Sequence, residues 1–178
     1  PDDATAIVFD VTATDIHGNE SDAATYSLLL TADDALAFTP NWNLISFDIA
    51  IEDNAPEVIF AEFLESGNLI YVTGFGEIGS MYYDPSAPPP FNTLTSIEAG
   101  LGYWVKLNES DDITEQGMPL TVSTAIDLMQ SWNLIGYWLA DDMSPEEAFA
   151  ELVESGNLIY VTGYNEGFTF YDPSLEPF

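Results

Sequence analysis

Cysteine is absent from the 178 residues, and basic residues are almost absent, because Lys106 is the only lysine or arginine. Without cysteine the chain has no disulfide, no thiolate metal site, no c-type haem and no cysteine nucleophile. Asp and Glu together number 31, so the formal net charge is −30. Nucleic acid and anionic membranes are therefore repelled as partners, and cations are attracted. Brine or an acidic medium would relieve the self-repulsion of such a chain.

Long apolar runs and catalytic motifs are also lacking. No apolar run reaches the roughly 18 residues that cross a bilayer, so no membrane insertion is expected. His17 is the only histidine, and we expect it in a turn rather than in a catalytic triad. No Gly-x-Ser-x-Gly elbow and no Walker loop occurs. The segment Gly74–Gly79 matches Gly-x-Gly-x-x-Gly, but it lies between two expected strands and is interpreted as a hairpin loop. We expect no enzyme.

The chain repeats itself. The ten residues Glu65–Gly74 recur without change as Glu154–Gly163, a shift of 89 positions. Two shorter identities keep the same order: Trp42–Ile45 with Trp132–Ile135, and Tyr83–Ser86 with Tyr171–Ser174. An internal duplication of this kind is typical of modular arrays and polymers. Hydrophobic residues make up 47% of the chain, which is enough for packed cores.

The pattern predicts an α+β, β-rich fold of two duplicated small antiparallel sheet or barrel units, each with one packed helix. We expect N-terminal β strands over residues 1–34, a first repeat unit over 35–124 and a second over 125–178. The second helix has Ser144 as its expected N-cap, Pro145 at its first position and Glu147 completing a capping box. The strands expected beyond residue 40 are 43–49, 69–72, 80–83, 102–107 and 119–123 in the first copy, and 133–139, 158–161 and 168–171 in the second.

The second copy lacks a counterpart of the strand Gly102–Leu107. Ala6–Thr12 is apolar and alternating, and with Thr25–Thr31 it reads as two strands around a turn. Three interpretations stay open. The strand Ala6–Thr12 could complete the second unit of a neighbouring chain, it could close on its own chain, or the sequence could be cut from a longer protein. If Ala6–Thr12 paired only with Thr25–Thr31, donation of this strand would be wrong and the third interpretation would hold. Under the first interpretation the assembly contacts are Ile7, Val8, Phe9 and Val11.

Two resemblances add to this reading. The stretch Val11–Ser21 resembles the last hairpin of bacterial fibronectin type III modules. The Trp-Asn-Leu-Ile opening, the helix and the Gly-Tyr-Trp-Val-Lys strand resemble repeats of very large secreted bacterial surface proteins, over about residues 28–178. This resemblance implies an extracellular, architectural or adhesive role without catalytic residues. The chain departs from that pattern in the second copy, which lacks the final strand, and in its near absence of Lys and Arg.

Calcium is the one metal that the composition favours, because it needs only oxygen ligands. The candidate ligands are Asp15, Asn19 and Asp22 in the first turn. No other cofactor is expected.

The aromatic residues give a second set of candidates. Trp42 and Trp132 occupy the same place in both copies, and we expect both to be buried in equivalent cores. Trp104, Tyr137 and Trp138 are candidate contacts for another subunit or a glycan, if they are exposed.

Together these features favour a non-catalytic extracellular structural protein, a self-associating subunit of a filament or surface layer, held by strand donation between subunits. The alternative is a carbohydrate-binding or spacer module of a secreted multidomain hydrolase. The expected partners are copies of the chain itself, and then glycans.

Overall fold

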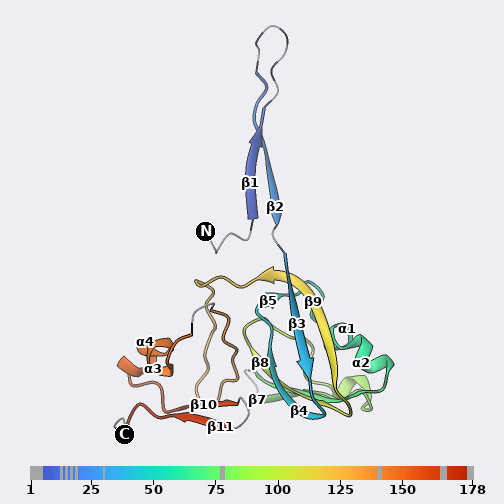
Figure 1. Cartoon of the computed structure of the whole chain (residues 1–178), viewed down its shortest axis with the longest axis vertical. Coiled ribbons are helices and arrows are strands. Elements are labelled where there is room, and N and C mark those ends of the chain that lie inside the picture. Colours follow the sequence, from blue (N-terminus) through green and yellow to red (C-terminus); the bar gives the residue numbers. More distant parts are fainter. Residues whose placement is uncertain are drawn as a thin grey trace. The chain divides into compact units, whose positions relative to one another are not determined.

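The computed structural model of the chain describes residues 6–12, 14, 16, 18, 20–29, 31–76, 79–139, 142–164 and 168–175. The chain divides into two compact units, Pro1–Trp138 and Leu139–Phe178, called the first and second unit below. Both contain short helices and antiparallel strands (Figure 1). The β-rich α+β class expected from the sequence is confirmed.

The N-terminal strands form a hairpin. β1 (Ala6–Val11) and β2 (Ala24–Leu29) make a two-stranded antiparallel sheet of their own, in continuous register from Ala6 opposite Leu29 to Val11 opposite Ala24. The two strands predicted around a turn are therefore confirmed. Donation of residues 6–12 as a lone strand is wrong, because β1 is hydrogen-bonded to β2 along its length and, among the described residues, to no other strand. This is the pairing expected under the third interpretation.

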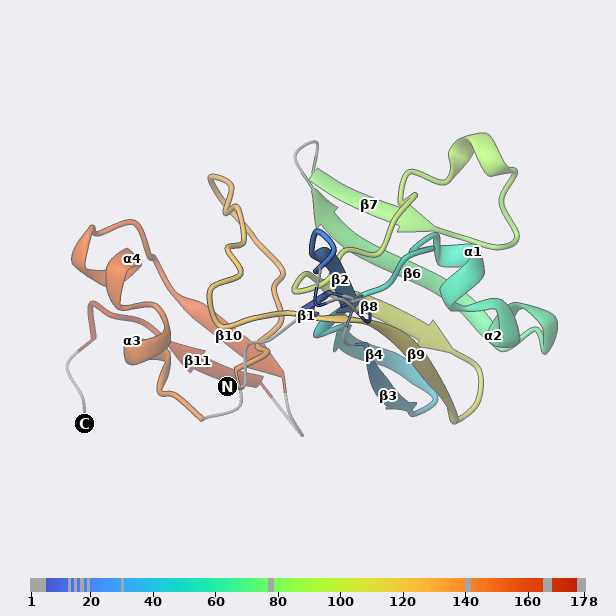
Figure 2. The ribbon, with the colours of Figure 1, turned by 90° about the horizontal axis from the view of Figure 1, so that it is seen from above.

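The largest sheet belongs to the first unit and has the order β4-β8-β6-β7. Its strands are β4 (Asn41–Ser46), β8 (Gly102–Leu107), β6 (Leu69–Gly76) and β7 (Gly79–Tyr83). Each neighbouring pair is antiparallel. β8 has the predicted boundaries. The glycine-rich segment joins β6 to β7, with Gly76 opposite Gly79, as expected for a hairpin connection (Figure 2).

A three-stranded sheet, in the order β3-β9-β5, completes the first unit. Its strands are β3 (Ala32–Phe38), β9 (Asp111–Pro119) and β5 (Ile49–Ala50). The sequence did not predict β3, because alanine and aspartate are poor strand formers. Pairing with β9 compensates, since alternate residues of β3 become half-buried and Phe38 is fully buried. The last strand ends at Pro119, whereas the prediction started it there.

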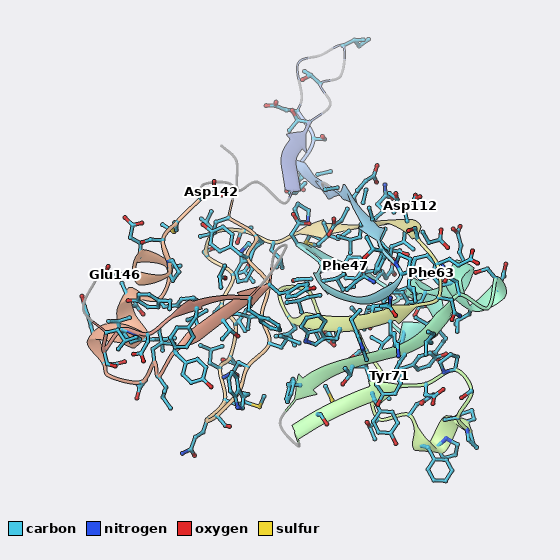
Figure 3. The ribbon with its side chains drawn as sticks, turned by 60° about the horizontal axis from the view of Figure 1, so that its bottom comes forward. Phe47, Phe63, Tyr71, Asp112, Asp142 and Glu146 are labelled. Carbon is cyan, nitrogen blue, oxygen red and sulfur yellow. The ribbon has the colours of Figure 1, made fainter. Side chains whose placement is uncertain are left out.

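Two short helices lie between β5 and β6: α1 (Pro56–Ile59) and α2 (Ala61–Glu65). A 3-10 helix, η1 (Pro89–Phe91), lies between β7 and β8. The core of the first unit lies between these helices and the sheets, and includes Phe47 and Phe63 (Figure 3). Tyr103 of β8 is buried there, and its hydroxyl accepts a hydrogen bond of 2.7 Å from the Glu98 N–H. Burial raises the pKa of Tyr103 to about 12.

The second unit holds α3 (Pro145–Ala148), α4 (Ala150–Glu154), β10 (Val161–Tyr164) and β11 (Phe168–Tyr171). The predicted capping box is confirmed. Ser144 Oγ accepts a 3.3 Å hydrogen bond from the Glu147 N–H, and Glu147 Oε2 accepts a 3.1 Å hydrogen bond from the Ser144 N–H. The hydrogen bonds that Glu147 Oε2 accepts from the Ser144 N–H and, at 2.9 Å, from Ser144 Oγ lower the pKa of Glu147.

The strand predicted over residues 133–139 does not form. Only an isolated bridge joins Ile135 to Leu101, flanked by hydrogen bonds of 2.8 Å from Gly102 N to Leu134 O and from Gly136 N to Gly100 O. This segment therefore packs on the first unit, and the division between the units falls after Trp138 rather than at the expected repeat boundary.

Two carboxyl groups of the first unit predict a pH dependence. Burial, together with the neighbouring Asp48 carboxylate, raises the pKa of Asp34, against a hydrogen bond from the Asp48 N–H. Burial also raises the pKa of Glu115. A raised folded-state pKa means that stability is greatest below the unfolded pKa, 3.8 for Asp34, and falls as the pH rises through the folded pKa. Asp34→Asn should therefore stabilise the first unit at neutral pH, with a gain that vanishes in acid.

Denaturant unfolding of Asp34→Asn across the acid-to-neutral range measures this gain. Asp33→Asn is the matched control, because Asp33 is exposed and the variant has the same change in net charge. An equal gain in both variants would mean that relief of the overall negative charge, and not the burial of Asp34, is the cause.

Candidate functional site

Over its described residues, the second unit keeps the helices and the β-hairpin of the duplicated fold but not the further strands that accompany them in the first. In the first unit, β6 is paired on both sides, with β7 and β8. Among the described residues of the second unit, β10 is paired with β11 alone. The side of β10 that corresponds to the β8 side of β6 is therefore a sheet edge. Backbone N–H and C=O groups on such an edge are a template for another strand.

Apolar side chains that the first copy buries are half-buried in the second. Phe60, Phe63 and Val72 are each 0% exposed. Their counterparts at the shift of 89 are half-buried: Phe149, Leu152 and Val161. Neither α3 nor α4 has a fully buried residue. Ile159 and Phe168 are 78% and 81% exposed. Apolar side chains left uncovered in this way are candidates for an interaction surface.

A duplicated asparagine shows what the second unit lacks. Asn68 is buried, and its Oδ1 accepts hydrogen bonds from the N–H groups of Asn108 (3.1 Å) and Glu109 (2.8 Å), just after β8. Its Nδ2 donates to Asp111 Oδ2 at 3.0 Å, at the start of β9. The counterpart Asn157 is exposed, and its Nδ2 donates to Ser155 Oγ at 3.1 Å. In the first copy this asparagine side chain is therefore hydrogen-bonded to the turn after β8 and to the start of β9. In the second copy its amide is hydrogen-bonded to Ser155, two positions before it in the sequence.

A duplicated glycine makes room for a different neighbour in each copy. A Cβ at Gly74 would come within 2.8 Å of the Tyr103 ring, so that only glycine leaves space for this buried tyrosine of β8. Gly163 stands at the equivalent place in β10, where a Cβ would come within 2.7 Å of Thr169 Oγ1 of β11. The glycine of the second unit therefore leaves space for its own hairpin partner.

Local turns fold alike in both copies. Asp84 Oδ1 accepts hydrogen bonds from Ser86 N at 2.8 Å and Ser86 Oγ at 2.7 Å, and Asp172 Oδ1 accepts from Ser174 at 2.8 and 2.6 Å. These hydrogen bonds lower the pKa of both aspartates. The difference between the copies therefore lies in long-range strand pairing, and not in local structure.

The two duplicated tryptophans are not core residues, and their predicted burial is wrong. Trp42 is 43% exposed and Trp132 is 55% exposed. Trp42 lies on β4 opposite Lys106 of β8, three positions before the buried Ile45, and an odd separation places the two on opposite faces of the strand. The Lys106 Nζ lies 5.4 Å from the centre of the Trp42 ring, within cation–π range.

Aromatic rings continue across the outer face of this sheet. Trp42 meets Tyr71 edge to face at 6.2 Å, and Tyr71 stacks on Tyr82 at 5.8 Å. Tyr71 lies on β6 (Figure 3). The second unit repeats part of this row, with the rings of Tyr160 and Phe170 5.4 Å apart. We call Trp42, Tyr71 and Tyr82 the aromatic row.

The three aromatic candidates come from two segments. Trp104 lies on β8 and is half-buried. Tyr137 is 50% exposed, whereas Trp138 is half-buried and donates its Nε1–H to Thr121 O at 3.0 Å. Trp138 therefore helps to hold the segment after Ile135 on the first unit. The aromatic row was not singled out from the sequence, because only the strand register brings its members together.

The structure describes only some of the residues predicted to bind calcium or to form assembly contacts. Asp22 is exposed, and Asp15 and Asn19 lie outside the described residues. Over the described ranges, no group of three His, Cys, Asp or Glu side chains is placed to hold a metal ion. The backbones of Ile7, Val8, Phe9 and Val11 lie in β1, and their side chains are outside what the structure describes.

Comparisons with known proteins give no relative: no family model, no curated protein and no solved structure matches the chain. No helix among the described residues is both long enough and apolar enough to span a membrane. The internal duplication is therefore the available template for the second unit, because the first unit shows how the equivalent surface is covered.

Proposed function

We propose that this protein is a non-catalytic structural protein of the cell exterior, whose copies associate into a filament or surface layer by adding strands to the second unit. The observation that supports this proposal is the edge of β10, with half-buried and exposed apolar residues beside it. In the first copy the equivalent edge is filled by a strand, and the equivalents of the half-buried Phe149, Leu152 and Val161 are buried. Strand addition satisfies an edge and buries apolar surface in one step.

The charge sets the conditions under which copies meet. Each subunit has a net charge of −30, so that approach of two copies is opposed by repulsion over the Debye length. Salt shortens this length, divalent cations bind carboxylates, and acid protonates them. Association outside the cell, in a cation-rich or acidic medium, therefore needs no oppositely charged partner.

We expect the subunits to associate weakly in salt-free buffer at about pH 8. Their association should become stronger on addition of sodium chloride, calcium or mild acid. Sedimentation velocity over a range of protein concentrations measures this, and electron microscopy shows whether the product is a filament or a layer. Magnesium at the same concentration as calcium separates general screening from specific calcium binding. Stronger association on transfer into salt-free buffer would mean that charge repulsion is not the controlling term.

The aromatic row supports a second candidate, a carbohydrate-binding module. Three rings on β4, β6 and β7, on the outer face of one sheet, one of them 43% exposed, offer apolar faces to a sugar chain. Affinity electrophoresis in gels that contain polysaccharides tests this candidate. Retardation of the unmodified chain, lost in Trp42→Ala and kept in Trp132→Ala, would support a glycan site on the row. Equal mobility in all gels would count against it.

A further inference from the structure

We propose that the β1–β2 hairpin of a neighbouring copy occupies, on the second unit, the place that β8 and β4 occupy in the first. This inference rests on the proposed function, and it names the segment that is donated. The donated element is a preformed hairpin and not a lone strand, since β1 is already paired with β2. The resulting sheet, β2-β1-β10-β11, has the same antiparallel order as β4-β8-β6-β7.

The two strand pairs have the same length and direction. β1 and β2 are joined by six antiparallel residue pairs, and β8 and β4 are also joined by six. Ala6 opposite Leu29 corresponds to Gly102 opposite Ser46, and the two registers then continue in step to their last pairs. The hairpin can therefore replace the β8–β4 pair without any shift in register. Only the order along the chain differs, because β1 precedes β2 and β8 follows β4.

The apolar pattern of β1 matches the inner face of β8. In β8 the inward residues Tyr103, Val105 and Leu107 are 2%, 0% and 1% exposed. Aligning Ala6 with Gly102 places apolar residues at all three inward positions: Ile7, Phe9 and Val11. Such alternation is how an added strand is recognised, because every second side chain meets the partner surface.

The register on β10 follows from the first copy. Val72 of β6 lies opposite Val105 and Thr73 lies opposite Trp104. At the shift of 89, the same pairing places Phe9 opposite Val161 and Val8 opposite Thr162. Phe9 therefore occupies an inward position and Val8 an outward one.

Charge is compatible with this hairpin as the donated segment. Of the 31 acidic residues, β1 and β2 contain only Asp10. The second unit has acidic residues at its helices, among them Asp142 and Glu146 (Figure 3), and residues 139–178 contain no lysine or arginine. A strand pair with one acidic residue is thus repelled only weakly by this unit.

The hairpin gains as well. A two-stranded sheet is at best marginally stable in water, and a third strand or a packed face stabilises it. Within the described residues of one chain, β1–β2 and β10–β11 are separate two-stranded sheets. Each sheet therefore gains from a further strand, and in this proposal a neighbouring copy supplies it.

Two variants of the full chain test the register. Phe9→Lys and Val8→Lys change the net charge equally, but only the first places a lysine at an inward position. In sedimentation velocity with added salt, Phe9→Lys should weaken association by roughly a hundredfold, because an unpaired charge is buried. Val8→Lys should associate at least as well as the unmodified chain. Equal weakening of both, or of neither, overturns the hairpin register while self-association stands. If the unmodified chain stays monomeric under every condition, the proposed function falls too.

Hydrogen exchange keeps the test decisive if Phe9→Lys unfolds the hairpin. The amides of β10 in the unmodified chain should become protected as protein concentration rises, with a midpoint that matches assembly. Protection that is independent of concentration would mean that the hairpin closes on its own chain. Assembly without protection of β10 would place the interface elsewhere. Either result overturns donation to a neighbour.

Discussion

Phe60→Ala should lower the free energy of unfolding of the first unit by about 3–5 kcal/mol, the usual cost of truncating a buried phenylalanine. Phe60 is 0% exposed and stacks on Phe63, with ring centres 6.1 Å apart. The alanine would leave a cavity in the core, because the surrounding residues relax only partially to fill it.

The chain provides its own control. Phe149 is the duplicate of Phe60 and is only half-buried, so Phe149→Ala should cost far less in the unassociated subunit. All four tryptophans lie in Pro1–Trp138, and tryptophan fluorescence therefore follows the first unit alone. The fluorescence-detected denaturation midpoint should fall in Phe60→Ala and stay unchanged in Phe149→Ala. Equal shifts would show that the two units unfold as one.

Association of the subunits should increase the effect of Phe149→Ala. If a donated hairpin covers the second unit, Phe149 becomes buried in the assembly, as Phe60 is in the first unit. Phe149→Ala should then weaken assembly in salt while leaving the monomer nearly unaffected. Normal assembly of this variant would mean that its site stays open in the polymer.

Asn68→Ala should destabilise the first unit by about 1–3 kcal/mol, the cost of leaving a buried polar group unsatisfied. The variant removes the acceptor of the Glu109 N–H and the donor to Asp111, and so releases the turn between β8 and β9. Asn157→Ala, the duplicate change at an exposed side chain, should stay within about 0.5 kcal/mol of the parent.

Asn68→Asp separates the two functions of this side chain. The aspartate can still accept from the Glu109 N–H, but it places a carboxylate within hydrogen-bond distance of Asp111 in place of a donor. Its stability should therefore recover in acid, where one of the two carboxyls is protonated. A loss that does not depend on pH would show that the contact with Asp111 contributes nothing.

Sequence reasoning succeeded where the signal was local. The alternating aromatic and β-branched residues of Gly102–Leu107 and Phe168–Tyr171 predicted β8 and β11 with their observed ends. The spacing of Ser144, Pro145 and Glu147 predicted the capping box. In each case the residues that decide the structure are within a few positions of one another.

It failed where a distant partner decides. Trp-Asn-Leu-Ile is a strand at Trp42–Ile45, where β8 pairs with it, and is no strand at Trp132–Ile135. β3 was missed for the converse reason, because its poor strand formers are held by β9. Because Trp42 recurs as Trp132, both were predicted to be buried. Which face of a strand is buried depends on how the sheet packs, and the repeat does not show this. For the candidate site, the unmatched Gly102–Leu107 pointed to an edge of the second unit, and among the described residues β10 pairs with β11 alone. The proposed register of the hairpin could be derived only from the observed strand pairings.

The position of Lys106 bears on the resistance of the protein to proteases. Proteases that cleave after lysine or arginine find a single target in these 178 residues, and it lies in the central strand of the largest sheet, half-buried and paired on both sides. Cleavage there requires the sheet to open, so its rate follows the population of the opened state. The folded first unit therefore protects its only cleavage site for such a protease, and the rest of the chain contains no lysine or arginine.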